Sequence, residues 1–151
     1  MKRLSWKYIA GFVDGEGCID IQASKGDYII PRLRIALAAE GKEVLDILQT
    51  NFGGSLFLRK SKNPNWSDAY SWEITGYKRV ASFLRNIVNH LIIKKQQARF
   101  ILWCESNLKG KLLTKEVRKN AIQEVKAMKR DPHRLSEKAQ EIILGCDSRA
   151  S

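Results

Sequence analysis

Apolar residues recur along the first part of the chain with a helical period and then with the two-residue period of strands. Residues 6–14 are expected to form a short helix, which Ser5 can cap at its start. Residues 18–24 and 29–38 then alternate polar and apolar side chains, as half-buried strands do. The turn-forming sequence Lys25-Gly26-Asp27 between them predicts a β-hairpin.

The rest of the chain repeats this order and then becomes helical throughout. A helix is expected at about 42–52, because its apolar residues fall on one side and Gly53 can end it. The further expected elements are strands at about 55–60 and 69–75 and helices at about 77–90, 95–107, 115–130 and 136–144. The pattern predicts an α+β fold with a helix-β-β-helix-β-β-helix core, a four-stranded antiparallel sheet and extra C-terminal helices. Residues 1–151 are expected to form a single domain.

The charge of the chain indicates which kind of partner it binds. The 151 residues include 27 Lys and Arg against 16 Asp and Glu, which gives a formal net charge of +11. Such a field attracts polyanions and favours nucleic acid as the partner, although a merely solvated basic surface has the same composition. The apolar fraction of 44% is too high for a disordered chain, and the apolar runs are too short to span a bilayer.

The cysteines and the N-terminal residues indicate the cellular compartment in which the protein is expected. Cys18, Cys104 and Cys146 have no metal-binding spacing and leave one cysteine unpaired, which favours a reducing setting. Asp14 and Glu16 interrupt the N-terminal apolar stretch too early for a secretory signal. An intracellular location, cytoplasmic or organellar, is therefore expected.

The first helix has an unusual composition at its C-terminal end. Gly11 and Gly15 each cost about 1 kcal/mol relative to alanine, but with Ala10 they would allow a second helix to approach closely. Asp14 and Glu16 lie where the helix already presents partial negative charge and unpaired carbonyls. Carboxylate and carbonyl oxygens together suit Mg²⁺ or Ca²⁺, and the alternative is an ordinary acidic turn.

Residues 10–17, Ala-Gly-Phe-Val-Asp-Gly-Glu-Gly, resemble the LAGLIDADG motif of homing endonucleases, and the expected order of elements also resembles that family. The resemblance implies a site-specific double-strand DNA endonuclease of the intron-encoded type. The chain holds one copy of the motif, which implies a homodimer acting on a long, partly palindromic target. The residues expected at the dimer interface are Ala10, Gly11, Asp14 and Gly15.

The resemblance also implies roles at the cleavage site. Glu16 would be catalytic and would bind Mg²⁺ together with the Gly15 carbonyl, and Ca²⁺ would support DNA binding without cleavage. Residues 91–98, Leu-Ile-Ile-Lys-Lys-Gln-Gln-Ala, resemble the segment that carries a lysine near the cleaved phosphate, and Lys94 is the matching residue. The chain departs from the family at Ala39, where many members carry a polar residue near the attacking water, and the next residue is Glu40.

The resemblance implies that the polar face of the sheet reads bases in the major groove. Arg32 and Arg34 lie two residues apart and therefore share a face, and arginine is suited to guanine. The other residues expected to contact DNA from the sheet are Gln22, Ser24, Arg59, Lys60 and Lys62. Phosphate contacts are expected from the basic segment 109–134, in particular from Lys129, Arg130 and Arg134.

Two other functions fit parts of the same pattern. A non-cleaving RNA maturase or DNA-binding regulator could use this scaffold, but it would have little reason to keep an acid at Glu16. A basic structural protein that binds nucleic acid loosely would show no site preference, which a salt titration against random and specific DNA would reveal.

Overall fold

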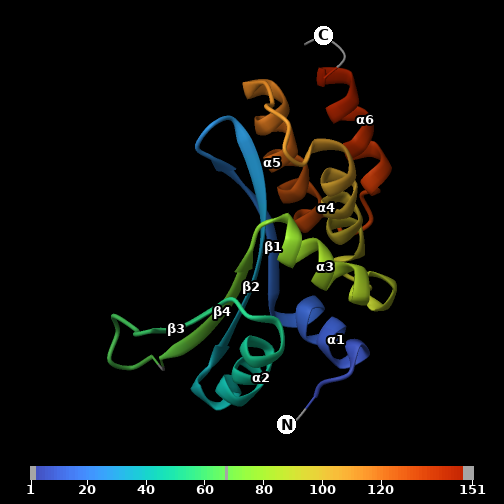
Figure 1. Cartoon of the computed structure of the whole chain (residues 1–151). Coiled ribbons are helices and arrows are strands. Elements are labelled where there is room, and N and C mark those ends of the chain that lie inside the picture. The colour runs from blue at the N-terminus through green and yellow to red at the C-terminus, as the bar shows by residue number, and fades with distance from the viewer. Residues whose placement is uncertain (1–2, 67, 148–151) are drawn as a thin grey trace.

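The computed structural model describes residues 3–66 and 68–147 and places the expected elements in the expected order (Figure 1). In chain order they are α1 (Trp6–Glu16), β1 (Gly17–Ser24), β2 (Tyr28–Ala38), α2 (Lys42–Phe52), β3 (Ser55–Arg59), β4 (Ala69–Thr75), α3 (Tyr77–Ile87), α4 (Lys95–Leu108), α5 (Lys115–Arg130) and α6 (Ser136–Asp147). The α+β fold class is confirmed. The largest boundary differences are that α1 continues to Glu16, that α6 continues to Asp147, and that α3 passes into a 3-10 turn at Val88–His90.

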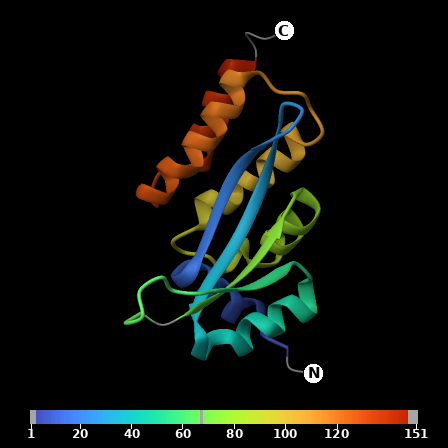
Figure 2. The ribbon, with the colours of Figure 1, turned by 90° about the vertical axis from the view of Figure 1, so that its left-hand side faces the viewer.

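The four strands form one antiparallel sheet in the order β1-β2-β4-β3. Directly paired residues point to the same side of an antiparallel sheet, so the register defines its two faces. One face, called the open face below, carries Cys18, Asp20 and Gln22 from β1, Arg32 and Arg34 from β2, Glu73 from β4, and Phe57 and Arg59 from β3. Figure 2 shows this side of the sheet, with no described helix crossing in front of it.

The opposite face of the sheet packs against helices and forms the main core. Leu33, Ile35 and Trp72 are fully buried there, together with Val13 of α1 and Leu84 of α3. Burying a large aliphatic side chain contributes about 1.5–3 kcal/mol. The helical layer therefore holds the sheet in place while its other side remains available.

Trp72 is also held by a polar contact that depends on two glycines. Its indole Nε1 donates to the Gly53 carbonyl at 2.8 Å. Gly53 and Gly54 end α2 with φ of 73° and 91°. A Cβ on Gly54 would lie 2.5 Å from the Glu73 carbonyl oxygen, so only glycine allows the chain to pass this close to β4.

The C-terminal helices extend the core and support the β1–β2 hairpin. Val125 and Met128 of α5 are buried in the same apolar cluster as the sheet residues. The tip of the hairpin is attached to this region, because Asp27 accepts a backbone hydrogen bond from Leu113 and pairs with Arg118 at 2.8 Å. Among the described residues, no helix has the combination of length and apolar character that crossing a bilayer requires.

Candidate active site

The first helix, α1, is followed directly by the strand β1, with no loop between them. Ser5 caps its start by accepting a hydrogen bond from the Tyr8 amide at 3.1 Å, as expected. At its end the Gly17 amide donates to the Val13 carbonyl, and a Cβ on Gly17 would lie 2.7 Å from that same oxygen. Glu16 is thus the last residue of α1, and its side chain is exposed.

Asp14 binds the segment that precedes α4, about eighty residues further along the chain. Its carboxylate accepts hydrogen bonds from the backbone amides of Ile92, Ile93 and Lys94 at 2.8, 3.1 and 2.9 Å. Its own carbonyl accepts from Lys94 Nζ at 2.6 Å. Asp14 therefore fixes both the backbone and the ammonium group of Lys94 at the end of α1.

Lys94 is a partly buried cation in this arrangement. Burial lowers its pKa below the ordinary lysine value, while the nearby negative charge of Asp14 acts in the opposite direction. Glu16 also lies close enough to act on it electrostatically. The structure thus brings together Glu16 and Lys94, the two residues expected at the catalytic centre.

A second lysine approaches this point from α5. Lys129 Nζ lies 3.8 Å from the Cys18 sulfur, which is on the open face two residues beyond Glu16. Lys129 also lowers the pKa of Lys94, because two neighbouring positive charges repel. The sequence predicted a phosphate contact for Lys129 and gave no sign that it lies near Cys18. The missing information was the packing of α5 beside β1, where Lys126 and Lys129 line one surface depression together with Cys18 and Asp20.

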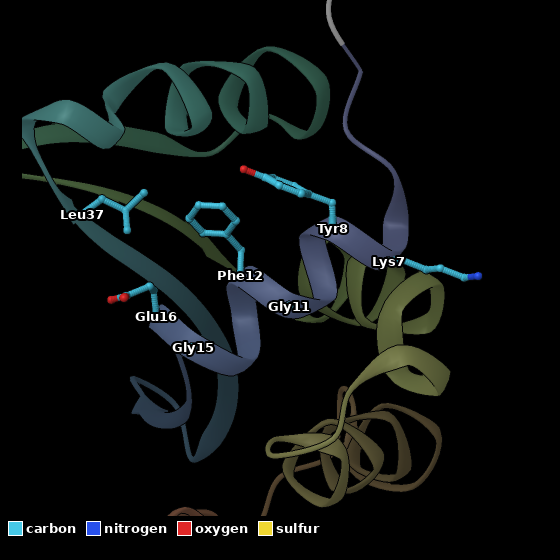
Figure 3. A pocket seen from close by; sticks show the side chains of 7 residues that line it. All are labelled: Lys7, Tyr8, Gly11, Phe12, Gly15, Glu16 and Leu37. Carbon is cyan, nitrogen blue, oxygen red and sulfur yellow. The ribbon is translucent and has the colours of Figure 1, made fainter.

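The outer side of α1 differs from the expected strip of small residues. Tyr8, Gly11, Phe12 and Gly15 share this side, because positions i, i+3, i+4 and i+7 coincide on a helix. With Lys7, Glu16 and Leu37 they line a shallow groove of about 540 Å³ (Figure 3). The Tyr8 and Phe12 rings are 5.2 Å apart, and Tyr8 is 48% exposed.

Two expectations for the dimer interface need correction. Ala10 is completely buried inside the protomer, on the same side of α1 as Ile9 and Val13, so its side chain cannot contact a second copy. The Asp14 carboxylate is used inside the protomer by the segment 92–94. Gly11 and Gly15 remain open, since a Cβ placed on either one meets no atom of residues 3–66 and 68–147 within 4 Å.

The open face of the sheet carries the expected arginines, but one of them has a partner. Arg32 is bound by Asp20 through two hydrogen bonds, which raise the pKa of Arg32 against the opposing effect of burial. Arg34 lies opposite Cys18 and Glu73 in the register. Arg59 lies on the same face and its guanidinium stacks near the Phe57 ring, 5.8 Å from its centroid.

Of the other residues expected to contact DNA, two have roles inside the protomer, and the rest are exposed or lie in a loop. Arg134 binds the largely buried Glu124 through Nε at 3.0 Å and Nη2 at 2.7 Å, so the structure does not support the phosphate contact expected of it. The Ser24 hydroxyl donates to the Lys25 and Tyr28 carbonyls and closes the β1–β2 turn. Gln22 and Arg130 are exposed, and Lys60 and Lys62 follow the end of β3.

The acidic groups of one protomer do not form a complete metal cage. Within residues 3–66 and 68–147, no three His, Cys, Asp or Glu side chains are grouped closely enough to hold an ion. Glu16 is exposed at the helix end beside the Gly15 backbone, and both supply oxygen donors of the type that Mg²⁺ and Ca²⁺ prefer. Ala39 lies in a 3-10 turn after β2 and has no polar group for orienting water, and Glu40 beside it is exposed.

Comparison with known proteins gives one family and a set of similar folds. The family model described as LAGLIDADG endonuclease matches residues 9–107. No curated protein sequence matches the chain. The homing endonuclease I-CvuI, solved in complex with its DNA target in the presence of Ca, is 22% identical over 94% of both chains, with a TM-score of 0.64.

Two further solved structures extend this comparison. The homing endonuclease I-TnaI is 26% identical, with a TM-score of 0.53, over 96% of this chain and 99% of that one. I-SmaMI, solved bound to uncleaved DNA target in the presence of calcium ions, is 21% identical with a TM-score of 0.61. The match covers 95% of this chain but only 50% of I-SmaMI.

Proposed function

The chain belongs to the LAGLIDADG endonuclease family, and we propose that it cuts double-stranded DNA as a homodimer with an active centre shared by the two subunits. Family membership makes it a site-specific DNA endonuclease. The homodimer, the bound divalent metal and the roles of individual residues are what we propose. The whole chain is taken to act as one domain in each subunit.

The observation that carries the proposal is the state of the two acids at the end of α1. Asp14 is occupied by three backbone amides, whereas Glu16 is exposed beside a groove with open glycines. Two α1 helices packed through Gly11 and Gly15 would bring the two Glu16 carboxylates together. Like charges at short range repel each other unless cations lie between them, and this favours a site completed by the second copy.

The oxygen donors at the helix end fit a divalent metal such as Mg²⁺. Glu16 and the Gly15 carbonyl would hold it, and Ca²⁺ would occupy the same donors while supporting only DNA binding. Similar proteins were solved with DNA targets in the presence of Mg or Ca. When bound, the metal lowers the pKa of water and neutralises charge that develops on the phosphodiester.

The protein's own residues position the DNA and stabilise charge. Lys94, held at the end of α1 by Asp14, places a fixed ammonium group where negative charge grows on the scissile phosphate. Partial burial strengthens this interaction, because fewer water molecules screen it. Lys129 adds a second positive charge from the side of β1.

The open face of the sheet would lie in the major groove and select the site. Arginine and glutamine side chains distinguish guanine and adenine there, and we assign base contacts to Arg32, Arg34, Gln22 and Arg59. Lys126 and Lys129 of α5 lie beside β1 at the edge of this face, and Arg130 is exposed at the end of the same helix. All three would contact phosphates. Lys60 and Lys62 follow β3 at the other edge of the sheet.

Replacement of Glu16 by Gln tests the catalytic assignment. The variant keeps the shape of the side chain but loses the charge that would hold the metal, so cutting in Mg²⁺ should fall to background on both strands. DNA binding in Ca²⁺ should persist, because the sheet and α5 supply the contacts. Strand-resolved cleavage and a gel shift measure the two effects, with DNA spanning the insertion site of its own gene as substrate.

Glu141→Gln is the matched control, since it makes the same change on the exposed surface of α6 and should cut like the wild type. Full cutting by Glu16→Gln would contradict the metal assignment. A wild-type protein that binds its site tightly and never cuts would instead favour a regulator or maturase.

A further inference from the structure

The open face of the sheet contains an acid that is fully engaged by an arginine on the neighbouring strand. Asp20 and Arg32 are direct partners in the β1–β2 register. Arg32 Nε donates to Asp20 Oδ1 at 3.1 Å, and Nη2 donates to Oδ2 at 2.6 Å. The side chains are 19% exposed for Arg32 and 28% for Asp20, so the pair is largely shielded but still reaches the surface.

The two hydrogen bonds use one edge of the guanidinium and leave another edge available. A guanidinium carries five N–H groups, one on Nε and two on each of the terminal nitrogens. With Nε and one N–H of Nη2 taken by Asp20, the adjacent N–H groups of Nη1 and Nη2 still form a parallel pair. Such a pair matches the O6 and N7 acceptors of guanine in the major groove.

An acid on a surface that binds a polyanion is unfavourable by itself. Each Asp20 subtracts from the positive field that attracts phosphate, so it weakens binding to every DNA sequence equally. A partly exposed ion pair also adds little to folding stability. What the carboxylate supplies is orientation, because a bidentate contact holds the long arginine side chain in one plane before DNA arrives.

We propose that Asp20 is a specificity-determining residue, which fixes Arg32 so that its free edge reads one guanine in each half of the DNA target. This inference rests on the proposed function, in which the open face enters the major groove. Asp20 acts through Arg32 and does not need to touch the DNA. Arg34 provides a contrast on the same strand, since it makes no comparable two-pronged contact with a carboxylate among the described residues.

The experiment compares base preferences at single positions. Selection from duplexes with a randomised central segment, in Ca²⁺, gives the sequence that the wild-type protein prefers. Gel shifts on its single-base variants then follow Asp20→Ala, Asp20→Asn and Arg32→Ala, with a thermal melt to confirm folding. Glu73→Gln is the matched control, because it removes one acid from the same face without breaking the contact between Asp20 and Arg32.

All three test variants should lose the preference for guanine at the same base pair, by roughly tenfold. The two Asp20 variants should also bind random duplex more tightly and with a steeper salt dependence, because they remove negative charge. Glu73→Gln should bind random duplex more tightly too, but keep the preference at that base pair. Loss of specificity together with a gain in general affinity is the signature of an orienting acid.

Asp20 variants that keep the full guanine preference would overturn the inference while leaving the proposed function intact. Equal weakening on all sequences would also overturn it, because Asp20 would then support the face as a whole. A wild-type protein without any sequence preference would overturn both the proposed function and this inference.

Discussion

At the scale of single residues, the two acids at the end of α1 have separate tasks because of their spacing. Positions two apart on a helix point in nearly opposite directions. Asp14 therefore faces the segment 92–94 within the protomer, and Glu16 faces the groove on the outer side of the helix. The pair combines one carboxylate that positions a lysine with one that remains available for a metal.

Asp14→Asn should slow cutting and shift its dependence on pH. The Asp14 carboxylate raises the pKa of Lys94 against the lowering effect of burial, so its loss should lower this pKa further. Since the proposed role of Lys94 requires a cation, activity should disappear at a lower alkaline pH than in the wild type. We also expect cutting to be roughly 10- to 100-fold slower, because Lys94 is held less firmly. Single-turnover cleavage across the alkaline range measures both effects.

Lys94→Arg is the control for this experiment, since an arginine keeps its charge over the whole range and should remove the alkaline decline. An unchanged alkaline limb in Asp14→Asn would mean that Asp14 supports only the fold of this segment.

At the scale of elements, the two opposite sides of α1 have different environments. Ile9, Ala10 and Val13 bind the helix to the core, while Tyr8, Gly11 and Gly15 face outward. Glycines cost helix stability, and among the described residues no atom would lie within 4 Å of a Cβ on Gly11 or Gly15. The proposed close approach of a second helix would explain the absence of side chains at these two positions.

Gly11→Leu should break the dimer without harming the protomer. A leucine has room within the protomer and improves helix propensity by up to about 1 kcal/mol, whereas it would hold two packed helices apart. Light scattering should show the mass of one chain, circular dichroism should show an unchanged fold, and cutting should be lost. Gly145→Leu on α6 is the matched control, because its Cβ position is equally open, and it should remain dimeric. A wild-type protein that is monomeric with and without DNA would refute the homodimer.

At the scale of the whole molecule, tertiary packing concentrates part of the positive charge at the edge of the open face of the sheet. The chain carries a formal charge of +11, and α5 brings Lys126 and Lys129 beside β1 at the edge of the open face. Other basic residues neutralise acids inside the fold, as Arg134 does for Glu124. Position therefore determines which of the basic residues can contribute to DNA affinity.

Lys129→Ala should weaken binding to all DNA sequences to a similar degree. Each phosphate contact that is lost should reduce the slope of log affinity against log salt by about 0.9, and a dimer loses two. Titrations with specific and random duplex at several salt concentrations measure this change. Lys138→Ala on the exposed surface of α6 should leave the slope unchanged. A changed base preference in Lys129→Ala would instead place this residue among the base contacts.

The sequence by itself determined the elements, their order, the α+β class and the family. Helix caps, turns and apolar periodicity involve residues close together in the chain, so Ser5, the turn at 25–27 and the end of α2 could be recognised directly. The resemblance of residues 10–17 and 91–98 to two segments of the family also indicated Glu16 and Lys94 as candidate site residues. Periodicity placed Arg32 and Arg34 on one face of a strand, which the register confirms.

Only the tertiary structure decided which partners these side chains have. Asp14 and Lys94 are separated by 80 residues, and Lys129 and Cys18 by 111, and no local pattern relates such positions. The same applies to Arg32, whose partner Asp20 became evident only from the pairing of β1 with β2, and to Ala10, which faces the core rather than a second copy. Periodicity states which side of an element a residue occupies, but the packing of distant elements determines what that side meets.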